Sequence, residues 1–155
     1  MTDSDLHIRR ARESDLSELI RLFEEDEHGG HGDTSDEQAF DDYVRAFHVI
    51  DQSLNEQLYV AKQGGEVVAS FQLAFLRTLR GRGGLTGVIE ALHTRSDKRG
   101  QGIGSKLLEF AVSEAKRRGC RLVQIRHRSD RDGTRAFYEK AGFSPDYTGF
   151  RMHFK

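Results

Sequence analysis

Apolar and polar positions along the first third of the chain predict one short strand and two helices. Residues 6–10 alternate between the two types, which is typical of a strand with one buried face. Ser14 and Asp15 then offer N-cap side chains to a helix whose apolar residues recur at helical spacing, and we expect it to end near His28. After a glycine-rich loop, a second amphipathic helix is expected to begin near Ser35.

The middle of the chain has the pattern of a β-hairpin followed by a further strand. Residues 57–63 and 66–76 both favour strands and are separated by two glycines, the usual signature of a tight turn. A basic, glycine-rich loop over 80–84 leads to a largely apolar run over 85–93. We therefore expect an antiparallel hairpin and then a strand near the centre of the sheet.

The last third of the chain predicts a helix between two strands. Residues 102–118 carry an apolar helical face and are followed by Gly119, which suits a helix C-terminus. The next strand is expected over 122–125, and a strand, helix, strand succession implies a parallel pair with a right-handed crossover. A short helix is expected over 134–141, which leaves 143–154 for one or two terminal strands.

Length, net charge and cysteine content limit the class of protein that this chain can be. A chain of 155 residues has the length of one ordinary domain, and without internal repeats or a low-complexity linker we expect a single domain over residues 1–155. The net charge of −1 creates no field that would gather nucleic acid or an anionic membrane, so neither is expected as a partner. There is a single cysteine, Cys120, and no run approaches the roughly 18 apolar residues of a membrane-spanning helix. These features predict a cytoplasmic protein.

A glycine-rich turn between the 85–93 strand and the 102–118 helix is the strongest candidate binding element. Unpaired amides and the positive dipole end at a helix N-terminus attract anions, and glycines let a phosphate approach the backbone closely. A Walker A loop and a dinucleotide-binding fingerprint would both need a glycine where this chain has Ser105. A glycine-rich connector without a ligand is the alternative. The turn consists of Arg99, Gly100, Gln101, Gly102, Ile103 and Gly104.

The turn and two flanking segments resemble the GNAT acetyltransferase family. The turn matches the family's pyrophosphate loop, Arg/Gln-x-x-Gly-x-Gly/Ala, at every fixed position. Residues 88–93 are similar to the family's preceding strand, and 136–143, Ala-Phe-Tyr-Glu-Lys-Ala-Gly-Phe, to its tyrosine-bearing segment. The matches stand in the family's order, so the resemblance covers nearly the whole chain. It implies the α/β (α+β) GNAT acyl-CoA N-acyltransferase fold, a mixed central β-sheet flanked by helices, with acetyl-CoA as co-substrate.

The resemblance also assigns residues to acetyl-CoA. The backbone at the strand end would pair with pantetheine and polarise the thioester oxygen, and the amides of the turn would hold the pyrophosphate. Where many family members have asparagine this chain has Arg131, which could reach a phosphate through its paired donors or lie on the surface. The residues expected to bind acetyl-CoA are Leu92, His93, Thr94, Arg99, Gly100, Gln101, Gly102, Ile103, Gly104, Ser105 and Arg131.

Two residues are the predicted catalytic groups. Transfer of an acetyl group from a thioester to an amine needs a base for the amine's proton and an acid for the departing thiolate. By resemblance, Glu90 is the base and Tyr138 the acid. Glu90 could instead bind the substrate electrostatically or face solvent, and Tyr138 could be a core aromatic residue. His93 or water competes with Glu90 for the base role, although histidines are more often paired to backbone or solvent.

The loop after the first helix is a candidate cover for the acceptor site. His28, His31 and Asp33 are potential ligands in a glycine-rich stretch but do not establish a site, so no metal is expected. An acidic run precedes the loop and would either attract a cationic amine or end the helix in solvent. This run is Glu24, Glu25, Asp26 and Glu27.

The sequence as a whole predicts an N-acetyltransferase that acts on a small-molecule amine. Its patterns are similar to those of small-molecule amine acetyltransferases, and a bulky peptide would need an open groove rather than a covered site. A protein or peptide acetyltransferase and a non-catalytic acetyl-CoA-binding module are the alternatives. Residues 150–154 could form an exposed terminal strand that pairs with a second copy, which would give a homodimer.

Overall fold

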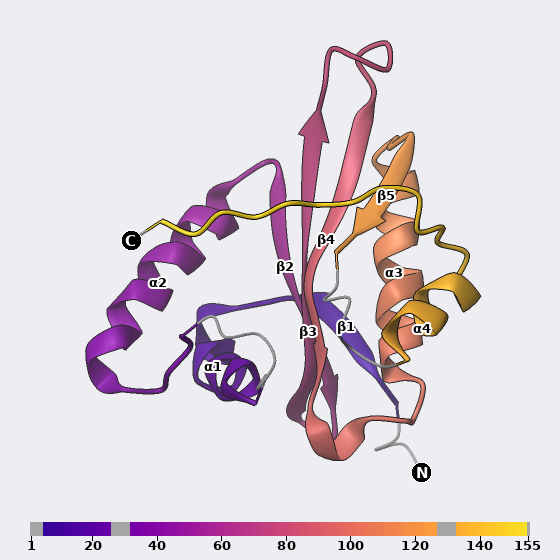
Figure 1. Ribbon diagram of the computed structural model, residues 1–155. Coiled ribbons are helices and arrows are strands. Elements are labelled where there is room, and N and C mark those ends of the chain that lie inside the picture. Colours follow the sequence, from indigo (N-terminus) through magenta and orange to yellow (C-terminus); the bar gives the residue numbers. More distant parts are fainter. Residues whose placement is uncertain (1–4, 26–31, 127–132, 155) are drawn as a thin grey trace.

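A sheet with helices on both sides organises the part of the chain that the structure describes (Figure 1). The computed structural model describes residues 5–25, 32–126 and 133–154. One side of the sheet carries α1 (Leu16–Glu24) and α2 (Glu37–Gln52), and the other carries α3 (Ile103–Arg117) and α4 (Thr134–Lys140). None of these helices is long and apolar enough to cross a membrane.

Within the described residues, the sheet has five strands in the order β1-β2-β3-β4-β5. Neighbouring strands are antiparallel from β1 to β4, whereas β4 and β5 are parallel. The predicted hairpin is therefore β2 and β3, and α3 is the connection between the parallel pair. The mixed sheet expected from the sequence is confirmed. The strands are β1 (His7–Arg10), β2 (Glu56–Gln63), β3 (Glu66–Arg77), β4 (Leu85–Thr94) and β5 (Leu122–Ile125).

Each face of the sheet packs on its own apolar cluster. On one face, Phe71 and Leu73 of β3 and Ile89 of β4 are almost fully buried in a cluster with Leu107 and Leu108 of α3. On the other face, a smaller cluster joins α1 and α2 to β2 and β3. Complete burial of such side chains contributes about 1.5–3 kcal/mol each. The larger cluster therefore fixes β4, the strand that carries the candidate site.

The start of α1 differs from the sequence prediction. Asp15 occupies the N-cap position after a 3-10 turn, but its carboxylate accepts no capping hydrogen bond from the helix. It accepts from the Arg12 amide at 2.7 Å and from the Arg9 guanidinium at 2.8 and 3.1 Å. Asp15 therefore ties β1 to the turn that precedes α1.

The remaining helix ends lie close to those predicted from the sequence, except for the end of α1. α1 ends at Glu24, whereas its apolar pattern predicts an end near His28, a residue outside the described ranges. α2 begins at Glu37, close to the predicted Ser35. Gly119 follows α3 with a φ of 81°, a left-handed conformation that glycine adopts without strain.

The prediction of terminal strands over residues 143–154 is wrong. After α4 the chain continues without regular secondary structure and passes in front of the sheet toward α2 in Figure 1. Phe150, Met152 and Phe154, in the segment expected to form an exposed terminal strand, are 96, 78 and 89% exposed. A strand forms only as part of a ladder, which needs a neighbouring strand within hydrogen-bond reach. Pro145 also lacks the amide proton that a ladder uses.

Candidate active site

Strand β4 carries a β-bulge in the segment predicted to meet acetyl-CoA. Glu90 and His93 are three residues apart but face β3 partners only two apart, so Ala91 and Leu92 share one position of the partner strand. Ala91 has a φ of 56°, a left-handed conformation that costs a residue with a Cβ about 1–2 kcal/mol. Bulges re-aim the amides and side chains beyond them, often beside active sites. The sequence contains no sign of this bulge, because an alanine does not indicate a positive φ.

Beyond the bulge, no described strand lies beside one edge of β4. β5 pairs with β4 only as far as Ile89, whose partner is Ile125 at the end of β5. β4 itself continues to Thr94. An extended ligand can add to such an edge through backbone hydrogen bonds. This is the edge at which the sequence places Leu92, His93 and Thr94 against pantetheine.

The glycine-rich turn leads from β4 into α3 with a backbone suited to an anion. A 3-10 turn over Ser96–Lys98 comes first, and α3 begins at Ile103. Gly100 and Gly102 have φ angles of 78° and 83°, and apart from each glycine and its chain neighbours no atom lies within 4 Å of where a Cβ would stand. The first turn of α3 has no acidic residue that would oppose an anion at its positive dipole end.

One hydrogen bond and one close approach place the turn beside β4 and α4. Arg99 donates from Nε to the carbonyl oxygen of Thr94 at 3.1 Å. A Cβ on Gly104 would lie 3.4 Å from the ring of Phe137 in α4 and 3.8 Å from the hydroxyl oxygen of Thr94. The end of β4, the first turn of α3 and α4 therefore converge. This convergence brings the predicted pyrophosphate loop next to the predicted pantetheine edge.

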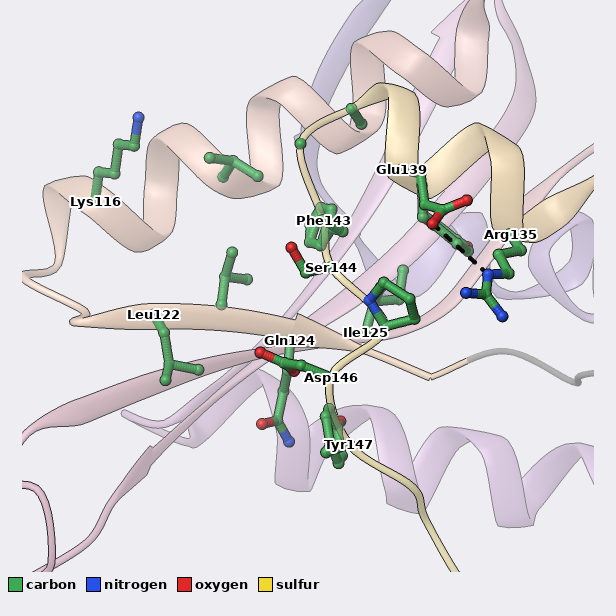
Figure 2. A pocket seen from close by; sticks show the side chains of 16 residues that line it. Lys116, Leu122, Gln124, Ile125, Arg135, Glu139, Phe143, Ser144, Asp146 and Tyr147 are labelled. Atoms are coloured by element: carbon green, nitrogen blue, oxygen red, sulfur yellow. Dashed lines mark ion pairs between the residues drawn. The ribbon is translucent and has the colours of Figure 1, made fainter.

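Tyr138 of α4 belongs to an aromatic cluster. Its ring centroid lies 5.1 Å from that of Phe137 and 6.1 Å from that of Phe143, both in edge-to-face geometry. Tyr138 also lines an open cavity of about 530 Å³ between α3, β5, α4 and the segment after α4 (Figure 2). Such ring contacts are expected if Tyr138 is an aromatic residue of the core, the alternative to its role as the acid. The role of Tyr138 as the acid stays a prediction.

Glu90 forms an ion pair with Arg126, the residue directly after β5. Its Oε2 accepts from Arg126 Nε at 3.0 Å and from Nη2 at 2.5 Å. The side chains of Glu90 and Arg126 are 35 and 55% exposed. Their hydrogen bonds raise the pKa of Arg126 above its ordinary value. Arg126 was not foreseen from the sequence, although a parallel register that pairs Ile89 with Ile125 places it beside Glu90.

Comparisons with known proteins decide the family. The model of the acetyltransferase (GNAT) family matches residues 16–143, which include β4, the glycine-rich turn and Tyr138. The chain belongs to the GNAT acetyltransferase family. Members of this family use acetyl-CoA and act on amine acceptors. No curated protein matches the chain.

Solved structures show the same fold over nearly the whole chain. A protein from Bacillus halodurans C-125, described as a transcriptional regulator, is 37% identical, with 97% of this chain and 100% of that chain covered and a TM-score of 0.92. Glucosamine-6-phosphate N-acetyltransferase from Arabidopsis thaliana is 24% identical, with 98% and 100% covered and a TM-score of 0.82. A predicted acetyltransferase from Clostridium acetobutylicum, solved with acetyl-CoA, is 21% identical, with 95% and 96% covered and a TM-score of 0.71.

In this GNAT acetyltransferase, His93 faces the end of α1 and not solvent. Its side chain is 8% exposed, and Nε2 lies 4.0 Å from Glu25 Oε1. Glu25 also accepts a hydrogen bond from the Ser96 amide at 3.0 Å, and Glu24 accepts one from the Ser35 amide at 2.7 Å. The two glutamates thus join α1 to the segments before α2 and after β4. His93 is therefore the more buried of the two candidate bases, and the base role of either residue stays a prediction.

The loop between α1 and α2 is described only in part. Asp33 accepts a hydrogen bond from the Tyr43 hydroxyl at 2.8 Å, which anchors the end of the loop to α2. Within the described ranges, no group of three or more His, Cys, Asp or Glu residues could hold a metal ion. The predicted site residues that lie outside the described ranges are Asp26, Glu27, His28, His31 and Arg131.

Proposed function

We propose that this chain transfers the acetyl group of acetyl-CoA to a primary amine of a small molecule, by direct attack in a ternary complex. The observation that carries the proposal is the construction of β4. This one strand holds the bulge at Ala91, the edge beyond Ile89 and the carboxylate of Glu90, and it leads through a single 3-10 turn to the glycine-rich turn. A donor site and a base are therefore adjacent on a strand whose other side is fixed by the core.

Acetyl-CoA fits the residues that are present. The extended pantetheine arm of acetyl-CoA can hydrogen-bond to the β4 edge at Leu92 and Thr94. The turn with its left-handed glycines lies where the pyrophosphate of the same molecule would follow. The turn residues that would surround the pyrophosphate are Arg99, Gly100, Gln101, Gly102, Ile103, Gly104 and Ser105. Arg131 is a further candidate for a phosphate contact.

The chemistry requires two proton transfers. The amine nitrogen attacks the thioester carbonyl carbon, so that a carbon–nitrogen bond forms and the carbon–sulfur bond breaks. Glu90 takes the proton that the nitrogen loses, directly or through water, and Tyr138 gives its hydroxyl proton to the departing thiolate. A phenol is protonated at neutral pH and can serve as this acid. A backbone amide at the bulge would stabilise the carbonyl oxygen as it gains negative charge.

Support for a small acceptor comes from the way α1 and α2 meet the sheet. Glu25 fastens the end of α1 to Ser96 near the glycine-rich turn, and Glu24 fastens the segment before α2 to α1. The described segments on either side of the α1–α2 loop are therefore tied to α1, which favours a confined acceptor site over the open groove that a peptide would need. The Arabidopsis neighbour is, by its name, an enzyme for a small amino sugar.

Release of coenzyme A thiol from acetyl-CoA tests the proposed function. The acceptor panel contains aminophosphonates, amino acids, polyamines, aminoglycosides and short peptides. We expect release with at least one class of small amine. Release with peptides alone would assign a protein acceptor instead. Binding of acetyl-CoA without release from any amine would contradict the proposal and favour a non-catalytic binding module.

A further inference from the structure

The ion pair of Glu90 and Arg126 stands where an acceptor amine has to reach the base. Val88 of β4 pairs with Gln124 of β5, and strand alternation places Glu90 and Arg126 one step further along the same face of the sheet. Figure 2 shows Gln124 and Tyr147 together on one side of β5. The carboxylate that would accept the amine's proton is thus already in contact with a guanidinium. Any acceptor has to be compatible with that positive charge.

The carboxylate of Glu90 offers the Arg126 guanidinium only one acceptor oxygen for two donors. Arg126 directs both Nε and Nη2 to a single oxygen, Oε2 of Glu90. A guanidinium fork binds best to an anion that offers two oxygens, one to each donor. Glu90 and Arg126 are also 35 and 55% exposed, and ion pairs at such exposure contribute little net stability. A ligand with a two-oxygen anionic group can therefore replace Glu90 as the partner of Arg126.

We propose that Arg126 selects acceptors that carry an anionic group beside the amine, so that the substrate class is a zwitterionic amine. The carboxylate, phosphate or phosphonate oxygens of the acceptor take Arg126, and this exchange frees Oε2 of Glu90 to receive the proton of the amine. The inference rests on the proposed function and narrows it. Arg126 acts here as a specificity-determining residue and takes no part in the proton transfers.

Other classes of amine meet a less favourable site. A polyamine brings a second cation close to Arg126, and like charges about 4 Å apart repel even in a well-hydrated site. A neutral amine leaves Arg126 on Glu90, which keeps one carboxylate oxygen occupied. Toward the C-terminal end of β4, the carboxylate of Glu25 is already engaged with Ser96 and faces His93. The expected order of preference is zwitterion, then neutral amine, then polycation.

Matched pairs of acceptors test this inference. Glycine is compared with glycinamide, and 2-aminoethylphosphonate with ethanolamine, by kcat/KM for thiol release. We expect the wild type to prefer at least one zwitterion over its partner by about tenfold or more, and Arg126→Gln to abolish that preference through KM. The pair with the larger preference distinguishes a carboxylate from a phosphonate ligand. Arg117→Gln is the matched control, because Arg117 pairs with Glu114 on an exposed face of α3.

A binding measurement covers the case in which none of the four amines turns over. The same compounds are titrated into the protein saturated with coenzyme A, and the backbone amide NMR signals of Glu90 and Arg126 are followed. Saturable shifts with a zwitterion, absent with its partner and lost in Arg126→Gln, are expected. Equal effects of both members of each pair, or no shift with either zwitterion, would overturn the inference. If neutral amines support thiol release at the same rate in the wild type and in Arg126→Gln, the inference about Arg126 is overturned. The proposed acetyl transfer would still stand.

Discussion

The structure contains two ion pairs between an arginine and a carboxylate, toward opposite edges of the sheet, and they differ mainly in burial. Asp15 and Arg9 join β1 to the turn before α1, with side chains 4 and 18% exposed and a third hydrogen bond from the Arg12 amide. Glu90 and Arg126 stand beyond the last paired residues of β4 and β5, at 35 and 55% exposed. The first pair uses two carboxylate oxygens and the second only one. The same chemistry thus builds a fixed corner in one region and an exchangeable contact in the other.

The difference predicts which property each pair controls. Removing one partner of a buried pair leaves an uncompensated charge out of water, which destabilises the fold strongly. Removing one partner of an exposed pair leaves a hydrated charge, which costs little. Variants at the β1–α1 corner should therefore change stability, and variants at the end of β4 should change turnover.

The largest expected effect is on the unfolding free energy of Asp15→Ala. We expect it to fall by about 3–5 kcal/mol, because Arg9 and the Arg12 amide lose their shared acceptor in a buried place. Urea denaturation measures the change. Asp42→Ala, which breaks an exposed pair with Arg45, is the control and should cost less than about 1 kcal/mol. If Asp15→Ala and Asp42→Ala lose similar amounts of unfolding free energy, burial does not determine how much an ion pair contributes to stability.

The reverse pattern is expected for Glu90→Gln. Loss of the base should lower kcat by about 100-fold or more. The unfolding free energy should change by less than about 1 kcal/mol, because the side chain is partly exposed. Steady-state thiol release and urea denaturation of the same preparation give both values. A stability loss as large as that of Asp15→Ala would make Glu90 a structural residue.

Tyr138→Phe separates the acid role from aromatic packing. The substitution keeps the ring contacts with Phe137 and Phe143, so the melting temperature should stay close to that of the wild type. The kcat should fall by about tenfold to 100-fold, because the thiolate loses its proton donor. Tyr147→Phe, which removes a hydroxyl from an exposed ring, is the control. An unchanged kcat in Tyr138→Phe would leave only the packing role.

The smallest expected effect is the pH dependence of stability at the β1–α1 corner. Burial alone would raise the pKa of Asp15, but the hydrogen bonds from Arg9 and Arg12 outweigh it and lower that pKa. The folded state therefore favours the carboxylate, which adds stability above the unfolded pKa of about 3.9 and loses it as the pH falls through the lower folded value. The stability gap between wild type and Asp15→Asn should narrow below about pH 4. A gap that stays constant down to pH 2 would contradict the lowered pKa of Asp15.

The sequence predicted most of the fold because its signals are local. Helical spacing marked α2 and α3, two glycines marked the β2–β3 turn, and the 122–125 run marked β5. The prediction of terminal strands failed because it considered only the segment itself, with Phe150, Met152 and Phe154, whereas a ladder also needs a partner strand from elsewhere in the chain. Asp15 was interpreted as a helix cap for the same reason, since its real partner, Arg9, comes from another element.

The candidate site was predictable in its parts but not in its geometry. The glycine-rich turn, Glu90 and Tyr138 came from a family pattern, whereas the bulge at Ala91 has no counterpart in residue type. The ion pair with Arg126 depends on the register of two strands that are separated by the whole of α3. A single sequence does not fix that register until the sheet order is known.

A crystal structure with acetyl-CoA would test the central claim, that the β4 edge and the glycine-rich turn hold the acetyl donor beside Glu90. We predict the pyrophosphate on the amides of the turn from Arg99 to Gly104. We also predict pantetheine along Leu92 and Thr94, with the thioester within reach of Glu90 directly or through one water. A donor bound away from the β4 edge and the glycine-rich turn would contradict the account.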